Sequence, residues 1–389
     1  MADQKQILNI TLQKGTPATE ESSNQLPPLT KGQHFFYGAA EHPLLAPRGV
    51  CIVDDKLIVA DTGQNRVFIW EDYRRLLAEG TTHADPLLVL GQADEQGTGR
   101  NAGGSTSAHS LHYPSGIWSD GKYLMVADAW NHRVLIWHEF PTTSGQAADT
   151  VLGQPDFISN QPNVAGIGAA PTAKSLNWPY GLFSDGHRLW IADTGNRRIL
   201  VFDKIPTENY TAADQVIGKA SFTERDYDHH DPIWPYSVKI GPKGELLVAD
   251  TQYYRCLFWK NWQDAGQQHS DLVIGQPSLS DNGMNQYDLF PRADTLSWCY
   301  DAGFYQDGLL VADTGNSRIL WFNQIPQKSG TAANNLIGKP HFRMGSENAA
   351  TVFGTEAQLY WPFSLCTSDH FLALADTGNH RVSLQELIK

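Results

Sequence analysis

Aromatic side chains cluster around a short motif that recurs six times in the sequence, and they are the residues best suited to binding a ligand. The motif reads Pro-x-Gly in its most regular copies, as at Pro114–Gly116 and Pro179–Gly181. The residues directly before it are Ala46, Tyr113, Trp178, Trp234, Trp298 and Trp361. The residues in its middle are Arg48, Ser115, Tyr180, Tyr236, Tyr300 and Phe363. Nine of these twelve positions are aromatic, so we expect a ligand-binding rim where the fold brings the six copies together.

One cation and one carboxylate stand among these aromatic residues. Arg48 is the cation, in the first copy, and Asp301 is the carboxylate, at the third position of the fifth copy. A funnel lined by aromatic rings and tyrosine hydroxyls, with these two charges, suits an organic ligand that has apolar planar faces and few charges. The alternative for the tryptophans is that they only pack between neighbouring repeats.

The fifth copy departs from the motif, with Cys299 in place of proline and Asp301 in place of glycine. A carboxylate among aromatic residues is a candidate acid or base, an anchor for an amine of a ligand, or a partner for Arg48. The alternative is that Asp301 accepts hydrogen bonds from nearby backbone amides. Cys299 would need a base to act as a nucleophile, and His42 or His112 would have to come from other repeats.

Histidine is frequent, with 14 residues, but the histidines are scattered along the chain. The segment Asp226–Asp231, with the sequence DYDHHD, contains side chains that are compatible with metal binding. Its close spacing equally suits an ordinary acidic loop. We therefore assign no metal and no cofactor from the sequence.

The elements that position these residues are copies of a longer repeat, first seen at Leu57–Trp70 as LIVADTGQNRVFIW. Each copy holds an apolar run rich in β-branched residues, a short polar segment and a second apolar run, which predicts a β-hairpin. The repeated aspartates are Asp61, Asp128, Asp193, Asp250, Asp313 and Asp376. An arginine follows each aspartate five residues later, at Arg66, Arg133, Arg198, Arg255, Arg318 and Arg381. The fixed spacing predicts a charge-assisted clamp that holds the turn or joins neighbouring repeats.

Two further markers complete a unit of four strands. The Pro-x-Gly motif opens a strand before each hairpin, and a short apolar run closed by glycine follows the first five hairpins. One such sheet cannot bury both of its faces alone, so the repeat predicts an all-β fold, a six-bladed β-propeller of four-stranded antiparallel blades. The last copy ends without its fourth strand, and His34–Gly38 matches the missing pattern. We therefore expect the ring to be closed by an N-terminal strand.

The pattern LxVADTGNxRVLxF, the Pro-x-Gly motif before it and the segment VLGQPDF (Val151–Phe157) together resemble the NHL-repeat family of β-propellers. The resemblance runs from about Gly32 to the C-terminus. It implies a six-bladed propeller but no single function, because the family includes RNA-binding modules, protein-interaction modules, sensor domains and an amidating lyase. That lyase binds zinc through histidines of its propeller, and no three histidines here occupy equivalent positions in alternating blades.

The composition limits the partners and the organisation of the chain. The formal net charge of −13 argues against a nucleic-acid partner, because phosphate binding needs clustered lysine and arginine. We expect residues 1–31, which are poor in apolar side chains, to be a flexible leader and residues 32–389 to form a single propeller domain. A helical turn is expected at Glu71–Gly80, and the four cysteines are expected to be buried free thiols.

No apolar run approaches the length of a membrane span, so no membrane association is expected. A cytoplasmic location follows if Met1 is the native start, and secretion follows if a signal peptide was removed. We expect a monomer.

The loops that join the blades run about 15 to 25 residues and emerge on the same face as the hairpin turns, so we expect function there. The leading interpretation is a binding module that presents the aromatic rim and these loops to a small organic molecule or a protein partner. The alternative is an enzyme, a lyase or hydrolase, that acts at the channel mouth with Asp301, Arg48 and a histidine. The sequence holds no catalytic set with diagnostic spacing, which favours the binding module.

Overall fold

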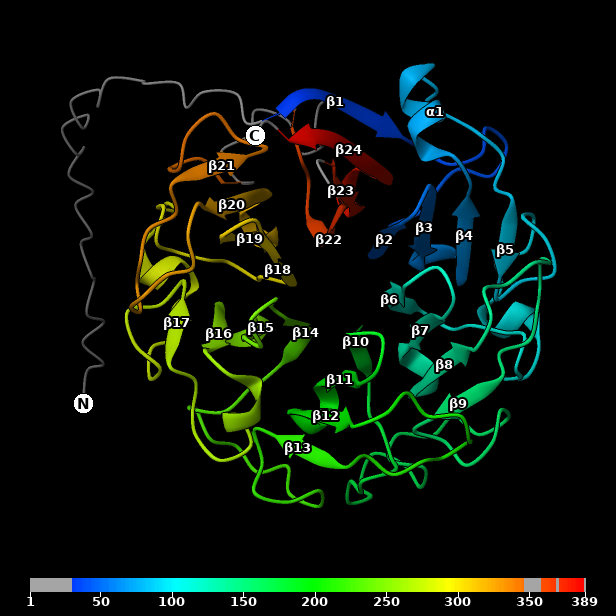
Figure 1. Cartoon of the computed structure of the whole chain (residues 1–389), viewed down its shortest axis with the longest axis horizontal. Coiled ribbons are helices and arrows are strands. Elements are labelled where there is room, and N and C mark those ends of the chain that lie inside the picture. Colours follow the sequence, from blue (N-terminus) through cyan, green and yellow to red (C-terminus); the bar gives the residue numbers. More distant parts are fainter. Residues whose placement is uncertain (1–29, 346–357, 369–370, 388–389) are drawn as a thin grey trace, which may run out of the picture.

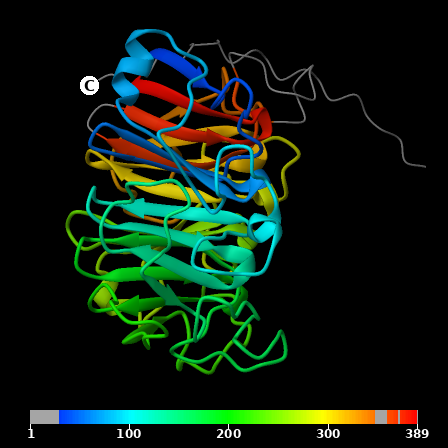
Figure 2. The ribbon, with the colours of Figure 1, turned by 90° about the vertical axis from the view of Figure 1, so that its right-hand side faces the viewer.

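Six four-stranded antiparallel sheets form a ring around a central axis in the computed structural model of the chain (Figure 1). The structure describes residues 30–345, 358–368 and 371–387. Figure 2 shows the ring from its edge, where the strands of neighbouring blades lie one above another. This architecture confirms the six-bladed β-propeller that the repeats predict.

In every blade the first strand lies nearest the axis, and the fourth lies at the rim (Figure 1). Blade 1 holds β2 (Gly49–Val53), β3 (Lys56–Asp61), β4 (Arg66–Trp70) and β5 (Leu88–Leu90). Blade 2 holds β6 (Pro114–Ser119), β7 (Leu124–Asp128), β8 (Arg133–Trp137) and β9 (Thr150–Leu152). Blade 3 holds β10 (Pro179–Ser184), β11 (Leu189–Asp193), β12 (Arg198–Phe202) and β13 (Gln215–Ile217).

The second half of the ring repeats this order, except that its last blade is built from both ends of the chain. Blade 4 holds β14 (Pro235–Ile240), β15 (Leu246–Asp250), β16 (Arg255–Trp259) and β17 (Leu272–Ile274). Blade 5 holds β18 (Asp301–Tyr305), β19 (Gly308–Asp313), β20 (Arg318–Phe322) and β21 (Asn335–Ile337). Blade 6 holds β22 (Pro362–Ser368), β23 (Phe371–Asp376), β24 (Arg381–Leu387) and β1 (Thr30–Phe36).

The second strand of each blade is buried on both faces, because every blade lies between two others. In β3, Leu57 and Val59 pack in an apolar core with blade 6, whereas Ile58 and Ala60 pack in a core with blade 2. All four side chains are fully buried. Successive side chains of a strand point to opposite faces of the sheet, so one apolar run contributes to two cores. Each of the six cores joins two neighbouring blades, so the stability of a blade depends on its neighbours.

The N-terminal strand closes the ring, as expected. β1 pairs antiparallel with β24, and Phe36 lies opposite Val382. The strand starts and ends earlier than the predicted segment His34–Gly38, since it spans Thr30–Phe36. Phe36 is buried and meets Trp70 edge to face, with the ring centres 4.9 Å apart. β1 is therefore bonded to blade 6 through its backbone and packed on blade 1 through Phe36.

Three smaller expectations have different outcomes. The leader, residues 1–31, lies outside the described residues except for Thr30 and Lys31, which belong to β1. The helical turn is confirmed as α1 (Tyr73–Ala78), and the Asp72 carboxylate caps it by accepting a hydrogen bond from the backbone N–H of Arg75 at 3.1 Å. Free thiols are found at Cys51, Cys256, Cys299 and Cys366, of which the first three are buried and the last is half-buried.

A buried ion pair lies at each of the six hairpin turns. In all six, arginine Nε donates to aspartate Oδ2 at 2.7 or 2.8 Å. In blade 3, Arg198 Nη2 also donates to the carbonyls of Thr172 and Ser175, in the loop that enters the blade. Its Nη1 donates to the carbonyl of Phe222, in the loop that leaves the blade. The Asp193–Arg198 pair thus ties the hairpin to both loops, which confirms the predicted clamp.

A threonine after the aspartate links one blade to the next. Thr194 Oγ1 donates to the carbonyl of Pro235 in blade 4. Thr377 Oγ1 donates in the same way to Pro47, which precedes the first strand of blade 1, so this bond crosses the closure of the ring. The motif Ala-Asp-Thr therefore recurs because its aspartate secures a turn and its threonine secures the neighbouring blade.

Deleting residues 1–36 is expected to lower the melting temperature sharply and to cause aggregation, because it leaves the backbone of β24 unpaired and uncovers Trp70. Differential scanning calorimetry and light scattering measure the two effects. Deletion of residues 1–29, which leaves β1 complete, is the matched control. A chain without β1 that stays monomeric at an unchanged melting temperature would show that closure is not needed.

Replacing Arg198 by methionine is expected to lower the free energy of unfolding by about 3 to 5 kcal/mol. The substitution leaves the Asp193 carboxylate buried without its counter-charge, and it removes the donors of three carbonyls. Urea denaturation measures the loss. The control is Arg75→Met, because Arg75 pairs with Glu79 at the surface, and such pairs contribute at most about 0.5 kcal/mol. Similar losses in both variants would refute a structural clamp.

Candidate functional site

Side chains from the middle of the Pro-x-Gly motifs converge on the axis of the ring. The set that lines the central cavity is Arg48, Ser115, Tyr180, Tyr236, Tyr300 and Phe363. Tyr180 stacks on Tyr236 with ring centres 4.6 Å apart, and Tyr300 stacks on Phe363 at 4.1 Å. Tyr236 also meets Tyr300 edge to face at 4.6 Å. The cavity left around them is about 30 Å³, enough for a water molecule, so these residues plug the channel instead of lining an open funnel.

Three tyrosines around this plug keep their protons well above neutral pH. Burial raises the pKa of Tyr113 to about 12. Burial also raises the pKa of Tyr180 and of Tyr300. Their hydroxyl groups are therefore hydrogen-bond donors at neutral pH, and they are unsuited to act as bases.

The Asp301 carboxylate is buried and already has its partners. Its Oδ2 accepts hydrogen bonds from the backbone N–H of Leu365 at 2.9 Å and from Ser364 Oγ at 3.1 Å. Its Oδ1 lies 3.6 Å from Lys239 Nζ, which comes from blade 4. Of the partners suggested for Asp301, Arg48 is therefore not the one found, because Lys239 supplies the opposite charge. The alternative of backbone amides accounts for two of its donors, Leu365 and Ala302, and the N–H of Ala302 lies 3.0 Å from Oδ1.

Arg48 lies on aromatic faces. Its guanidinium carbon is 4.0 Å from the ring centre of Phe363 and 5.0 Å from that of Tyr113. Its Nη1 also donates a long hydrogen bond of 3.5 Å to Tyr236 Oη. Among the residues that the structure describes, no carboxylate forms an ion pair with Arg48. A guanidinium held in this way has donors left for a ligand.

The residues directly before the motif have an unusual backbone. Five of the six are left-handed, with φ between 49° and 59°, and these are Ala46, Tyr113, Trp178, Trp298 and Trp361. A turn side chain of the preceding blade holds several of them through the backbone N–H. His132 Nδ1 accepts from Trp178 at 3.0 Å, and Ser317 Oγ accepts from Trp361 at 3.1 Å. The hairpin of one blade therefore fixes the rim residue of the next.

These tryptophans divide into two pairs. Trp178 and Trp234 are half-buried, with ring centres 6.2 Å apart, and they fit the packing alternative. Trp298 and Trp361 are 40% and 46% exposed. Packing alone gives no reason for two large aromatic side chains to stay this exposed on one face.

The two exposed tryptophans border an off-axis cavity of about 420 Å³ between blades 5 and 6. Its lining consists of Arg48, Met284, Ser297, Trp298, Tyr300, Thr314, Gly315, Trp361 and Phe363. The structure thus brings together five of the predicted ligand-binding residues here. The other six, Tyr113, Trp178, Tyr180, Trp234, Tyr236 and Asp301, lie outside this cavity.

Sequence reasoning missed a second cavity of about 480 Å³, which has a polar lining that includes Arg100, Asn101, Trp130, His132 and Asn160. Trp130 is 45% exposed and stacks on Tyr113 with ring centres 4.6 Å apart. The sequence does carry a signal for it, because Trp130 stands in a hairpin turn where four other copies have glycine.

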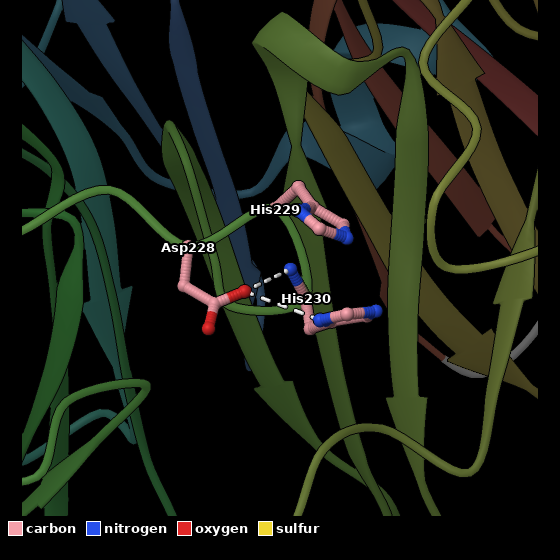
Figure 3. Close-up of side chains that lie close together, drawn as sticks. All are labelled: Asp228, His229 and His230. Atoms are coloured by element: carbon pink, nitrogen blue, oxygen red, sulfur yellow. Dashed lines mark hydrogen bonds and ion pairs between the residues drawn. The ribbon is translucent and has the colours of Figure 1, made fainter.

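One group of side chains among the described residues brings metal-compatible atoms together. Asp228, His229 and His230 each offer a ligand atom within 4.8 Å of the others. Figure 3 shows the two imidazole rings close together, with the Asp228 carboxylate beside His230. These residues belong to the segment Asp226–Asp231, to which the sequence alone assigned no metal.

The free energy of unfolding of the protein is expected to depend on pH through His132, which lines the polar cavity. Burial lowers the pKa of His132 from 6.5 to about 4, and nearby His112 adds to the shift. Between these two values the unfolded chain binds more protons than the folded chain, so stability present above pH 6.5 is lost as the pH falls toward 4. From pH 7 to pH 4.5, the wild type should lose about 2 to 3 kcal/mol more unfolding free energy than His132→Gln. Chemical denaturation tests this, with exposed His187→Gln as the control; identical pH profiles for wild type and His132→Gln would contradict it.

None of the described residues forms a helix that is long and apolar enough to cross a membrane.

No model of a known protein family matches the chain. The chain is similar to "NHL repeat-containing protein 2" of Homo sapiens, with 22% identity over 377 residues, which cover 89% of this chain and 47% of that protein. It therefore spans about half the length of this relative. Kuenenia stuttgartiensis hydrazine synthase has the same kind of fold, with 12% identity and a TM-score of 0.51 over 88% of this chain and 96% of the other. A streptogramin B lyase is 12% identical, with a TM-score of 0.48 over 92% of this chain and 98% of the other.

The six blades, the Asp–Arg hairpin in each of them and the similarity to an NHL repeat-containing protein lead to one assignment. The chain is a six-bladed β-propeller whose repeats are similar to those of an NHL repeat-containing protein.

Proposed function

We propose that this propeller is a binding module for a small planar organic anion, held in the off-axis cavity between blades 5 and 6. The observation that carries the proposal is the Arg48 guanidinium. It lines the cavity, rests on the ring of Phe363 and forms no ion pair with a described carboxylate. A carboxylate or phosphate of a ligand would supply the missing partner, since guanidinium binds both in bidentate fashion.

The cavity suits a planar ligand in size and lining. Its volume of about 420 Å³ lies within the usual range of small-molecule sites, roughly 300 to 1,000 Å³. Trp298 and Trp361 offer aromatic faces that are exposed before binding, so a ring of the ligand covers apolar surface without displacing protein side chains. Tyr300 and Phe363 supply further aromatic contact next to Arg48.

The charges around the axis favour an anion over an amine. Asp301 was the candidate anchor for an amine, but Lys239 lies 3.6 Å from it and balances its charge. Arg48 then remains as the cation of the rim without a carboxylate partner among the described residues. Asp301 and Lys239 line the central cavity together with Tyr180 and Tyr236. Tyr113 meets Tyr180 edge to face, and Trp178 and Trp234 contact each other, so these residues lie outside the proposed site.

The enzymatic alternative is not supported by the arrangement of its residues. Asp301 bonds to blade 6 and to Lys239, whereas Arg48 contacts aromatic rings. Among the described residues, no histidine lines either the central or the off-axis cavity. The three groups are thus not assembled around one position that a substrate could occupy.

A protein partner that presents a carboxylate beside an apolar side chain is the second candidate, and a specific patch favours it. Met284 lines the cavity, and it is 45% exposed. Tyr287 and Leu289, in the same loop, are 80% and 81% exposed. Apolar side chains exposed together on a long loop are typical of protein contact sites.

The test begins with a thermal-shift screen of the full chain against aromatic carboxylates, aryl phosphates and the corresponding neutral amides. We expect the anions to raise the melting temperature and the neutral amides to have little effect. For an anion that binds, calorimetry should show an affinity loss of about 1.5 to 3 kcal/mol in Arg48→Met and about 1 to 3 kcal/mol in Trp361→Ala.

Trp130→Ala is the matched control, because Trp130 is as exposed as Trp361 but borders the other cavity. Circular dichroism verifies that each variant folds. Equal affinity of wild type and Arg48→Met for every anion would disprove the assignment of the site. Binding of acidic peptides alone, with no response to small anions, would instead select the protein partner.

A further inference from the structure

Three imidazole rings meet between the loop that joins blades 3 and 4 and the segment that precedes β17. His229 and His230 are consecutive in the loop, and their ring centres are 3.9 Å apart. His269 comes from blade 4, and its ring centre lies 5.0 Å from that of His230. In a tetrahedral zinc site with Zn–N distances near 2.1 Å, the ring centres of two histidine ligands are roughly 5 Å apart. The rings of His230 and His269 thus already have this spacing, whereas the ring of His229 lies about 1 Å closer to His230 than this spacing.

Two of these histidines have a carboxylate on the side of the ring nearest the backbone. His230 Nδ1 lies 3.2 Å from Asp228 Oδ1, and His269 Nδ1 lies 3.7 Å from Asp231 Oδ1. A histidine that binds a metal usually donates its other N–H to a carboxylate, which fixes the ring and leaves Nε2 free to bind the ion. His230 is within hydrogen-bond distance of Asp228, whereas His269 lies close to Asp231 without a hydrogen bond. Figure 3 shows this relation for His230, whose second ring nitrogen points away from Asp228.

The loop that carries the two histidines is held in place. The backbone N–H of His230 donates to Asp228 Oδ1 at 2.9 Å, which forms a tight turn. The carbonyl of Asp231 accepts from Arg255 Nη2 at 2.9 Å, so the clamp of blade 4 anchors the loop. Asp231 Oδ2 lies 3.0 Å from Lys219 Nζ. The backbone of the segment is thus held at both ends, so binding of an ion would require rotation of the histidine side chains rather than movement of the loop.

An open cavity of about 330 Å³ adjoins the cluster, and its lining includes Asp228, His230, Asp231, His269 and Glu224. Both an ion and a water molecule can enter from solvent. The three carboxylates more than balance the single charge of Lys219, which is bound to Asp231, so the cluster favours a cation.

We propose that His229, His230 and His269 bind a divalent transition metal ion of the zinc type, with Asp228 and Asp231 as orienting partners and water as the fourth ligand. Three nitrogen donors select zinc, copper or nickel over magnesium and calcium, which prefer oxygen. Three protein ligands and a water make an open tetrahedral site, in which the water remains exchangeable. The site lies outside the two cavities at the rim, so it is independent of the proposed anion site.

The experiment titrates the full chain, freed of metal with a chelator, with Zn²⁺ in a calorimeter and with Co²⁺ in a spectrophotometer. We expect a single equivalent of Zn²⁺ to bind and Co²⁺ to give the intense visible bands of tetrahedral coordination. His230→Ala and His269→Ala should each weaken Zn²⁺ binding by at least about 10-fold, and Asp228→Asn should weaken it by about 10- to 100-fold. His187→Ala, an exposed histidine of blade 3, should bind Zn²⁺ as the wild type does.

Melting curves in the absence of metal show whether each variant is folded. Three results would overturn the proposal: no stoichiometric binding of Zn²⁺, equal affinity in the wild type and both histidine variants, or octahedral Co²⁺ bands that His230→Ala leaves unchanged. Unchanged Zn²⁺ binding in Arg48→Met is expected, and it separates this site from the anion site.

Discussion

The buried Asp–Arg pair is the interaction on which the rest of this propeller depends. Two opposite charges taken out of water at every hairpin are tolerated only because each one is fully bonded, to its partner and to the backbone of the adjoining loops. The loops between blades are long, and their own sequences vary. The pair therefore holds both ends of each loop in a fixed position. The sequences of the loops can then vary without altering the structure of the ring.

Much of the fold was predictable because its signals repeat. A hairpin, an ion pair and a glycine-closed strand that recur at a regular period can be read with little ambiguity, and the missing fourth strand of the last copy pointed directly to the N-terminus. The clamp was predictable for a local reason as well. Asp193 and Arg198 are the first residues paired across their hairpin, so five residues of separation determine their contact.

The candidate site was predictable only in its residue types. The six side chains at the axis come from six blades, and whether they leave a funnel or form a plug depends on how their shapes fit together, which no periodicity encodes. The cation that lies near Asp301 is Lys239 of β14, in the neighbouring blade. No motif in the sequence marks that position. The same limit applies to the histidine cluster. His269 lies 39 residues after His230 (269 − 230), and only the path of blade 4 brings their rings together.

The pairing of β1 with β24 can occur only after nearly the whole chain has been synthesised. Phe36 can cover Trp70 as soon as blade 1 has left the ribosome, but the backbone partner of β1 is β24, which ends at Leu387. The two segments are separated by 351 residues (387 − 36), and at 5 to 20 residues per second this length takes about 20 to 70 seconds to synthesise. Throughout that time the edge of β1 that pairs with β24 remains without its partner. Ring closure joins the two most distant parts of the described chain, and it pairs the edge of β24 that would otherwise remain open.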